Sequence, residues 1–444
     1  MPFDIIIGRN KEDKKKFGSR GLIYLGKGYV KMGNYTSLSN KIWMDVARSH
    51  VILIAGKRGS GKSYSVGVIA EEISNLPEDI RQNIAPLIFD TMGIFWTMKY
   101  KNEKDAELLD EWDLKAKNLP VSIWVPFGYF EEYEKRGISI DKKFSLAVSE
   151  LDIEDWLAIF DLSMISSVSI LIQRVLSNLK NSDFDIGDII ENIQKDKESN
   201  EESKKSAVSL FEAAGSWNVF ASKNEEPTKI SELIVAGTTS VLDLSMYSSI
   251  SVFNIRALII GLISKKLFNE RMLARKKEEL EDVKKGYSYF STSSEETGKE
   301  MPLVWIFVDE CHESLPRENK TPATDALVTL LREVRQPGIS LILATQQPGE
   351  IHKDVITQTD IVISLRVTAK KDIDALNEIM QTYLSGDLLK YFNMLPKMRG
   401  AALVLDDNSE KIYPVQIRPR FTWHGGEAPT LIKSKGEAAE KLGL

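Results

Sequence analysis

Residues 51–64 read VILIAGKRGSGKSY, and this stretch decides the fold. An apolar run ends at a loop of glycine, lysine, arginine and serine, and residues 56–63 match the pattern G-x-x-x-x-G-K-[S/T] without a mismatch. In such a loop the glycines let backbone N–H groups curl around a β-phosphate, where a side chain would collide. The apolar run predicts a strand and residues 63–76 predict a helix, whose N-terminus favours anions. The stretch therefore predicts a phosphate-binding loop, and a glycine-rich turn without a ligand is the alternative.

The polar residues of this loop each have an expected partner. Lys62 is expected to neutralise the β- and γ-phosphates, and the Ser63 hydroxyl is expected to bind Mg²⁺. The loop therefore predicts ATP and Mg²⁺ as cofactors. The residues that we expect to bind the nucleotide are Gly56, Gly59, Ser60, Gly61, Lys62, Ser63 and Tyr64.

A second motif predicts hydrolysis of the bound nucleotide. The apolar stretch PLVWIFVDE (302–310) ends in Asp309, which can hold the Mg²⁺ shell beside Ser63, and in Glu310, which can polarise the attacking water. A water-activating glutamate argues against a simple nucleoside kinase, which transfers phosphate to a bound acceptor. The next strand ends in Gln346, whose side chain could report the γ-phosphate, although a strand-end cap is the alternative.

Short apolar runs alternate with helix-like stretches along most of the chain. Nearly continuous hydrophobicity and β-branched residues are typical of strands that are buried on both faces of a parallel sheet. Strands alternating with helices predict a three-layer α/β domain. At least two runs, 86–90 and 240–244, fall between the phosphate loop and Asp309, which leaves room for a strand between the two motif strands, as in RecA-like motors. The runs are 51–55, 86–90, 121–126, 240–245, 303–310, 339–346, 361–366 and 401–405.

Charge and composition bound the function classes. The 444 residues carry a net charge of −6, which does not indicate a nucleic-acid binder overall, but the first 62 residues hold 13 basic and 4 acidic side chains. This basic front end suits a polyanion, and a solvated arm is the alternative for Lys11–Lys16. Cys311 is the single cysteine, which points to a reducing compartment. Without a membrane-length apolar stretch, the sequence favours a cytoplasmic protein that does not enter the membrane.

Several stretches together resemble the HerA branch of the HerA/FtsK superfamily of hexameric DNA-translocating ATPases. The resemblance runs from about Ser39 to Pro429, and its specificity comes from the order and spacing of the stretches. It implies a RecA-like P-loop fold of the additional-strand (ASCE) type. The stretches are RSHVILIAGKRGSGKSYSVGVIAEE (48–72), LIVAGTTSVLDLS (233–245), VDECHESLP (308–316), LREVRQPGISLILATQQP (331–348), QTDIVISLRV (358–367) and RPRFTWHGG (418–426).

The resemblance implies that ATP lies between neighbouring subunits and that an arginine from one subunit completes the site of the next. Arg335 is the first candidate for this finger and Arg332 the second, while a charge that complements the helix dipole is the alternative for both. Gln336 stands where the family has a second basic residue. Arg418 and Arg420 resemble the family's C-terminal segment, which braces the neighbouring subunit near its nucleotide, and the resemblance implies that both contribute to nucleotide binding.

The resemblance also implies a domain organisation. Residues 1–40 form a short basic segment with possible hairpin material, where full-length relatives have a β-barrel. Residues 41–140 form the first part of the core, and 141–222, which contain no convincing strand, form an inserted helical subdomain. Residues 223–410 form the second part of the core, and 411–444 form the bracing segment.

The partners implied by the resemblance are further copies in a homohexamer, double-stranded DNA, and a nuclease or defence effector. Loops that line such a ring carry basic side chains to phosphates, although solvated loop charge is as good an explanation for each. The leading hypothesis is a DNA-translocating ATPase in end processing or anti-phage defence. An ATP-gated scaffold for an effector enzyme and a viral genome-packaging ATPase are the alternatives. The candidate DNA contacts are Lys99, Lys101, Arg317 and Lys320.

Overall fold

The computed structural model of the chain describes residues 4–32, 35–180, 182–223, 225–247, 253–287, 301–380, 391–393 and 395–426. Within these residues the strands form one mixed sheet in the order β1-β3-β2-β13-β12-β11-β4-β10-β9-β5-β8-β6-β7. The strands are β1 (Ile5–Ile7), β2 (Leu22–Met32), β3 (Tyr35–Asp45), β4 (Val51–Ala55), β5 (Ile84–Asp90), β6 (Val121–Pro126), β7 (Lys142–Phe144), β8 (Thr239–Asp243), β9 (Leu303–Val308), β10 (Ile339–Thr345), β11 (Ile361–Leu365), β12 (Ala401–Asp406) and β13 (Lys411–Ile417).

The central part of the sheet, from β11 to β7, is parallel. Its strands are apolar on both faces: in β4, Leu53 joins the core on one side of the sheet, while Ile52 and Ile54 join the core on the other. This two-sided burial is why the strands read as continuous apolar runs rather than as alternating patterns. The three-layer α/β fold expected from the sequence is therefore present.

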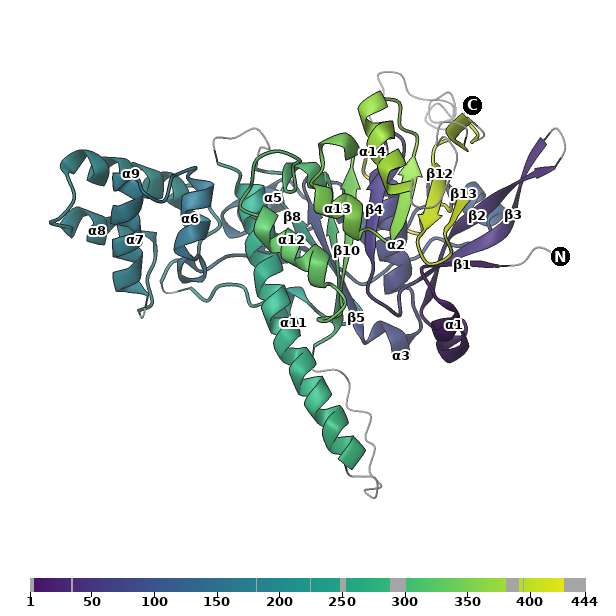
Figure 1. Ribbon diagram of the computed structural model, residues 1–444, viewed down its shortest axis with the longest axis horizontal. Coiled ribbons are helices and arrows are strands. Elements are labelled where there is room, and N and C mark those ends of the chain that lie inside the picture. The colour runs from purple at the N-terminus through teal and green to yellow at the C-terminus, as the bar shows by residue number, and fades with distance from the viewer. Residues whose placement is uncertain are drawn as a thin grey trace.

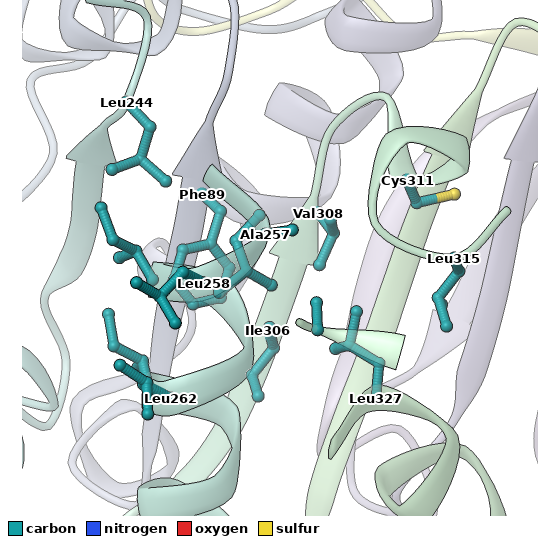
Figure 2. Close-up of a cluster of buried hydrophobic side chains, with 14 of the residues drawn as sticks. Phe89, Leu244, Ala257, Leu258, Leu262, Ile306, Val308, Cys311, Leu315 and Leu327 are labelled. Carbon is teal, nitrogen blue, oxygen red and sulfur yellow. The ribbon is translucent and has the colours of Figure 1, made fainter. Parts of the chain in front are cut away.

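Helices cover both faces of the parallel strands. The helix α2 follows β4 on one face, and α11 and α12 pack on the other (Figure 1). Figure 2 shows this second contact, where Ala257 and Leu258 of α11 and Leu327 of α12 meet Phe89 and Ile306 of the sheet. These helices are α2 (Lys62–Ser74), α3 (Glu78–Arg81), α4 (Ala106–Glu111), α5 (Phe130–Lys135), α10 (Ile230–Leu233), α11 (Ile255–Tyr287), α12 (Thr324–Glu333), α13 (Lys353–Gln358) and α14 (Lys370–Met380).

The strand between the two motif strands is β10, which pairs with β4 on one side and with β9 on the other. The sequence left room for an inserted strand, but it pointed to the strands that precede β9 in the chain. Both of those strands, β5 and β8, lie beyond β9 instead. The consequence for the site is that the end of β10 lies directly between the phosphate loop and Asp309.

A helical lobe lies at one end of the molecule (Figure 1). Its helices are α6 (Ile153–Ile159), α7 (Ser167–Leu179), α8 (Ile186–Lys195) and α9 (Glu201–Gly215). Aromatic rings fill its core, with Trp156 centred 4.9 Å from Phe211. The expectation that residues 141–222 contain no strand is wrong, because Lys142–Phe144 form β7 beside β6. Three residues at a sheet edge are too short to leave a periodic pattern.

The opposite end of the molecule carries the N-terminal strands (Figure 1). The hairpin material expected before residue 40 forms the antiparallel pair β2–β3, and β2 continues the sheet beside β13. The basic stretch Lys11–Lys16 lies in α1 (Lys11–Phe17), capped by Asn10, and its four lysines are exposed to solvent. In the part of the chain that the structure describes, no helix is both long and apolar enough to cross a bilayer.

Candidate functional site: a phosphate loop beside paired carboxylates

The loop between β4 and α2 is held in place by its neighbours. The Gly56 N–H donates to the Thr345 carbonyl at the end of β10, and the Lys57 N–H donates to the Arg366 carbonyl after β11. A Cβ at Gly56 would lie 2.5 Å from the Ser60 Oγ and 2.8 Å from the Leu365 Cβ, so only glycine fits there. Two other glycines of the loop, Gly59 and Gly61, have positive φ, which favours glycine at both positions.

The ends of β9 and β10 bring three side chains to this loop, Asp309 and Glu310 after β9 and Gln346 after β10. The Lys62 Nζ lies 3.5 Å from the Glu310 Oε1, and the Ser63 Oγ donates to the Asp309 Oδ2 over 3.3 Å. The Gln346 amide donates to the same Glu310 oxygen. Burial raises the pKa of Asp309 to about 6, with a further contribution from the Glu310 charge, while Lys62 acts in the opposite direction. The structure therefore brings together Lys62, Glu310 and Gln346, three of the five predicted catalytic residues, with the two predicted metal ligands Ser63 and Asp309.

Two buried polar atoms of this site have no hydrogen-bond partner among the described residues, namely the Ser60 Oγ and the Glu310 Oε2. The N-terminus of α2 has Gly61 as its cap, so no side chain satisfies its first N–H groups. Orphan donors at a helix N-terminus suit a phosphate, and a serine hydroxyl beside a carboxylate suits Mg²⁺. The residues present therefore fit a Mg²⁺–nucleotide.

Glu310 has a left-handed backbone, with φ of 47° and ψ of 48°. A glutamate is rarely found in this region, and such strain persists only where the surroundings enforce it. The next turn places the His312 Nδ1 3.6 Å from the Glu310 Oε2 and 3.2 Å from the Thr345 Oγ1. The sequence named Glu310, but nothing in it indicated this backbone or the contact of His312 with β10.

The two candidate arginine fingers lie far from their own chain's loop. Arg335 is exposed and precedes β10, whereas the phosphate loop lies at the other end of that strand. Seven residues separate the strand ends by about 20 Å. Arg332 pairs with Asp354 over 2.6 Å. Neither arginine belongs to the cluster around Lys62 in its own chain.

The side chains of Arg418 and Arg420 do not lie where the resemblance implied. Both side chains are fully buried inside their own chain, so in this structure they do not face a neighbouring subunit or a nucleotide. The Arg418 guanidinium pairs with Glu71 over 2.7 Å and with Glu72 over 3.2 Å. Their physical role here is to fix residues 418–424, which we call the strap, against α2. No motif in the sequence indicated Glu71 as the partner of these arginines.

The candidate DNA contacts are spread over loops at the carboxyl edge of the sheet. Lys99 pairs with Asp141 over 2.6 Å, and Lys320 pairs with Asp325 over 2.7 Å. Arg317 donates to the Gly349 carbonyl. Lys101 is exposed, and its backbone bridges to Thr422 of the strap. Among the described residues, no ion pair or side-chain hydrogen bond links these four side chains to one another.

Asp90, which received no role from the sequence, shapes one of these loops. Its carboxylate accepts N–H groups from Met92, Gly93 and Phe95, so it folds the chain after β5. Burial raises the pKa of Asp90 to about 8, and the neighbouring Asp243 carboxylate adds to the shift. An aspartate at a strand end followed by a glycine is the signal that could have predicted this turn.

Comparison with known proteins agrees with this geometry. The model of the family described as Helicase HerA, central domain, matches residues 30–267. The DNA double-strand break repair helicase HerA of Pyrococcus furiosus is 26% identical over 163 residues, covering 35% of this chain and 29% of the relative. A probable DNA double-strand break repair helicase HerA of Methanocaldococcus jannaschii is 31% identical over 87 residues, covering 20% and 17%. The aligned part thus spans less than a third of either curated relative.

Among solved structures, VirB4 of Thermoanaerobacter pseudethanolicus is similar with a TM-score of 0.51 and 13% identity, over 91% of this chain and 97% of VirB4. At this identity the likeness concerns the fold alone. Because the family model matches more than half of the residues, the chain belongs to the HerA helicase central-domain family, with the fold of RecA-like P-loop ATPases.

Proposed function

We propose that this protein hydrolyses ATP and uses the energy to move along double-stranded DNA as a homohexameric ring. The observation that carries the proposal is the convergence of Lys62, Glu310 and Gln346, which come from three adjacent strand ends. Phosphoryl transfer to water needs a cation that binds the phosphates and a carboxylate that positions the water. Here an amide also contacts this carboxylate. A nuclease or a defence effector is the proposed partner.

Each residue of the site has a proposed role. Lys62 and the backbone of residues 56–62 hold the phosphates, and Ser63 with Asp309 holds Mg²⁺, which neutralises charge on the transferring group. Glu310 orients the attacking water and accepts its proton. Gln346 touches Glu310 directly, so a shift at the γ-phosphate end reaches β10 through this contact.

The position of Arg335 supports an assembly. It lies at the end of β10 that is opposite to its own phosphate loop, so it could complete only the site of a neighbour. A contact that joins two different surfaces of identical chains closes into a ring when the rotation allows. A hexamer is the ring that we propose.

The first test uses two substitutions in the site. Lys62→Ala should abolish ATP binding, because no other side chain of the loop reaches the position between the phosphates and Glu310. Glu310→Gln should bind ATP with nearly wild-type affinity and hydrolyse it at least 100-fold more slowly, since water loses its base. Lys57→Ala is the matched control, because this exposed lysine contributes only its backbone to the loop. Hydrolysis by Glu310→Gln at the wild-type rate would contradict the mechanism.

The same assay, run with and without duplex DNA, separates the motor from a second candidate. Lys99 and Lys320 are already paired with carboxylates, which favours an ATP-gated scaffold that regulates an effector enzyme. A motor should hydrolyse ATP several-fold faster with duplex DNA, and the stimulation should fall steeply as salt rises. A scaffold should respond to its protein partner and ignore DNA.

A further inference from the structure

The orientation of a bound nucleotide follows from the positions of Glu310 and Gln346. Glu310 and Gln346 mark the γ-phosphate end, on the β9–β10 side of the phosphate loop. The base is attached to the other end of the triphosphate, and it therefore extends away from β9 and β10. On that side the sheet continues through β11, β12 and β13, and the chain then enters the strap (residues 418–424). The strap therefore lies on the side of the sheet towards which the base extends.

The strap brings an aromatic ring beside the first turn of α2. Tyr64 follows Ser63 in that turn, and its hydroxyl accepts the Arg420 N–H over 2.7 Å. The His424 ring lies 5.2 Å from the Tyr64 ring, centre to centre, at 78°. Both rings are only partly buried. Two rings from segments 360 residues apart in the chain thus meet next to the residue that we assign to Mg²⁺.

A buried carboxylate fixes the strap in this position. Glu71, which is fully buried in α2, accepts the Phe421 N–H at 2.8 Å and both the N–H and the hydroxyl of Thr422, at 3.1 and 2.8 Å. The other side of the strap pairs with the loop after β5, where the Trp423 N–H donates to the Tyr100 carbonyl over 2.8 Å. Hydrogen bonds on both sides of the strap therefore fix the backbone that leads to His424.

Arg420 also sets the proton position on His424. Its Nη1 lies 3.3 Å from the His424 Nδ1, and because a guanidinium can only donate, this nitrogen must be the acceptor. The ring is then neutral, with its hydrogen on Nε2. It can offer an aromatic face. A purine base, which is flat, can stack on such a face.

We propose that His424 and Tyr64 form the wall that receives the purine base of the nucleotide. This assignment rests on the proposed binding of ATP. It adds the residues that contact the base, whereas the phosphate loop contacts only the phosphates. Arg418 and Arg420 act as positioning residues, which hold the strap on α2 without touching the ligand.

The test compares ATP with tripolyphosphate, which carries the phosphates without the base. Binding of each ligand with Mg²⁺ is measured by calorimetry on the full chain in the Glu310→Gln background, so that nothing is hydrolysed. His424→Ala should weaken ATP binding about tenfold and leave tripolyphosphate binding unchanged, because only the stacking contact is lost. His424→Phe keeps an aromatic face and should restore most of the affinity for ATP.

Three results would overturn the proposal. His424→Ala could bind ATP as tightly as its parent, which would mean that His424 does not contact the base. Both ligands could weaken equally, which would mean that the strap supports the phosphate loop instead. The parent could bind neither ligand, in which case the proposed nucleotide binding itself fails and the base site fails with it.

Discussion

His50 lies between two carboxylates where the N-terminal strands join the central sheet. Its Nδ1 is 2.6 Å from the Asp360 Oδ2, and its Nε2 is 3.2 Å from the Asp45 Oδ2. Asp45 also pairs with Arg9, and all of these side chains except Asp360 are buried. Burial lowers the pKa of His50, but the charges and hydrogen bonds of Asp360 and Asp45 outweigh this and raise it to about 9.

This arrangement predicts that the N-terminal strands are held most firmly below neutral pH. A histidine whose folded pKa exceeds its unfolded value of 6.5 adds stability that is complete below pH 6.5 and is lost as pH rises through about 9. The contribution is on the order of 3 kcal/mol, at about 1.4 kcal/mol for each unit. Thermal unfolding at pH 6.5 and 9.5 should show a loss of stability in the wild-type protein that is much smaller in His50→Asn. An equal loss in both proteins would contradict this explanation.

The site residues illustrate which side chains the sequence could assign. Lys62, Ser63, Asp309 and Glu310 lie in two short motifs, because chemistry at a phosphate requires fixed spacing along a strand–loop–helix unit. Arg418 and Arg420 carry no such spacing, and only the resemblance suggested a role for them, near the nucleotide of a neighbouring subunit. Their burial depends on Glu71, 347 residues away from Arg418 in the chain, and only the folded structure reveals that pair.

At the scale of elements, the sequence predicted the buried strands best. The strands from β4 to β12 that read as apolar runs are present, because burial on both faces removes the need for alternation. The edge strand β7 and the terminal strand β13 were not predicted, since the first is three residues long and the second, KIYPVQI, contains polar residues and a proline. Strands of this kind are defined by their neighbours more than by their own composition.

The contact between α2 and the strap depends on a glycine. A Cβ at Gly67, in the middle of α2, would lie 2.5 Å from the Cζ and the Nη1 of Arg420. Alanine usually stabilises a helix by about 1 kcal/mol relative to glycine. Here Gly67→Ala should instead lower the free energy of unfolding by about 1–3 kcal/mol, because the buried guanidinium has to move.

Denaturant unfolding measures this change, with Gly215→Ala as the control. Gly215 ends α9, and a Cβ there would meet only the Ile186 Cγ2 at 3.8 Å, an ordinary contact. This control should be neutral or slightly stabilising. If Gly67→Ala stabilises the protein instead, the strap tolerates a displaced Arg420. That result would contradict the claim that Arg420 fixes the strap against α2.

At the scale of the whole molecule, the polarity of the sheet separates the two halves of the proposed catalytic site. The phosphate loop lies at the carboxyl end of β4, while Arg335 precedes β10 at the amino end of the sheet. The separation follows from the parallel direction of β4 and β10, whatever their order in the sheet. The position of β10 between β4 and β9 was the step that sequence reasoning missed, because a sequence does not fix strand order, and this position places Gln346 between the phosphate loop and Asp309.

Mixing two inactive variants tests whether neighbouring subunits share a site. Lys62→Ala destroys the phosphate loop but keeps Arg335, whereas Arg335→Ala keeps the loop but removes the finger. In a mixed ring, a subunit with an intact loop can receive Arg335 from a Lys62→Ala neighbour. Equal mixing should restore up to about a quarter of the wild-type ATPase rate, the share of interfaces with both parts, if sites act independently.

Arg332→Ala is the matched control, because Arg332 lies on the same helix and pairs with Asp354 of its own chain. It should retain ATPase activity by itself, and it therefore needs no complementation. Rescue in mixtures with Arg332→Ala, but not with Arg335→Ala, would move the finger to Arg332. If both variants assemble like the wild-type protein and yet no mixture regains activity, the subunits do not share a site, and hydrolysis must be completed by residues of the same chain.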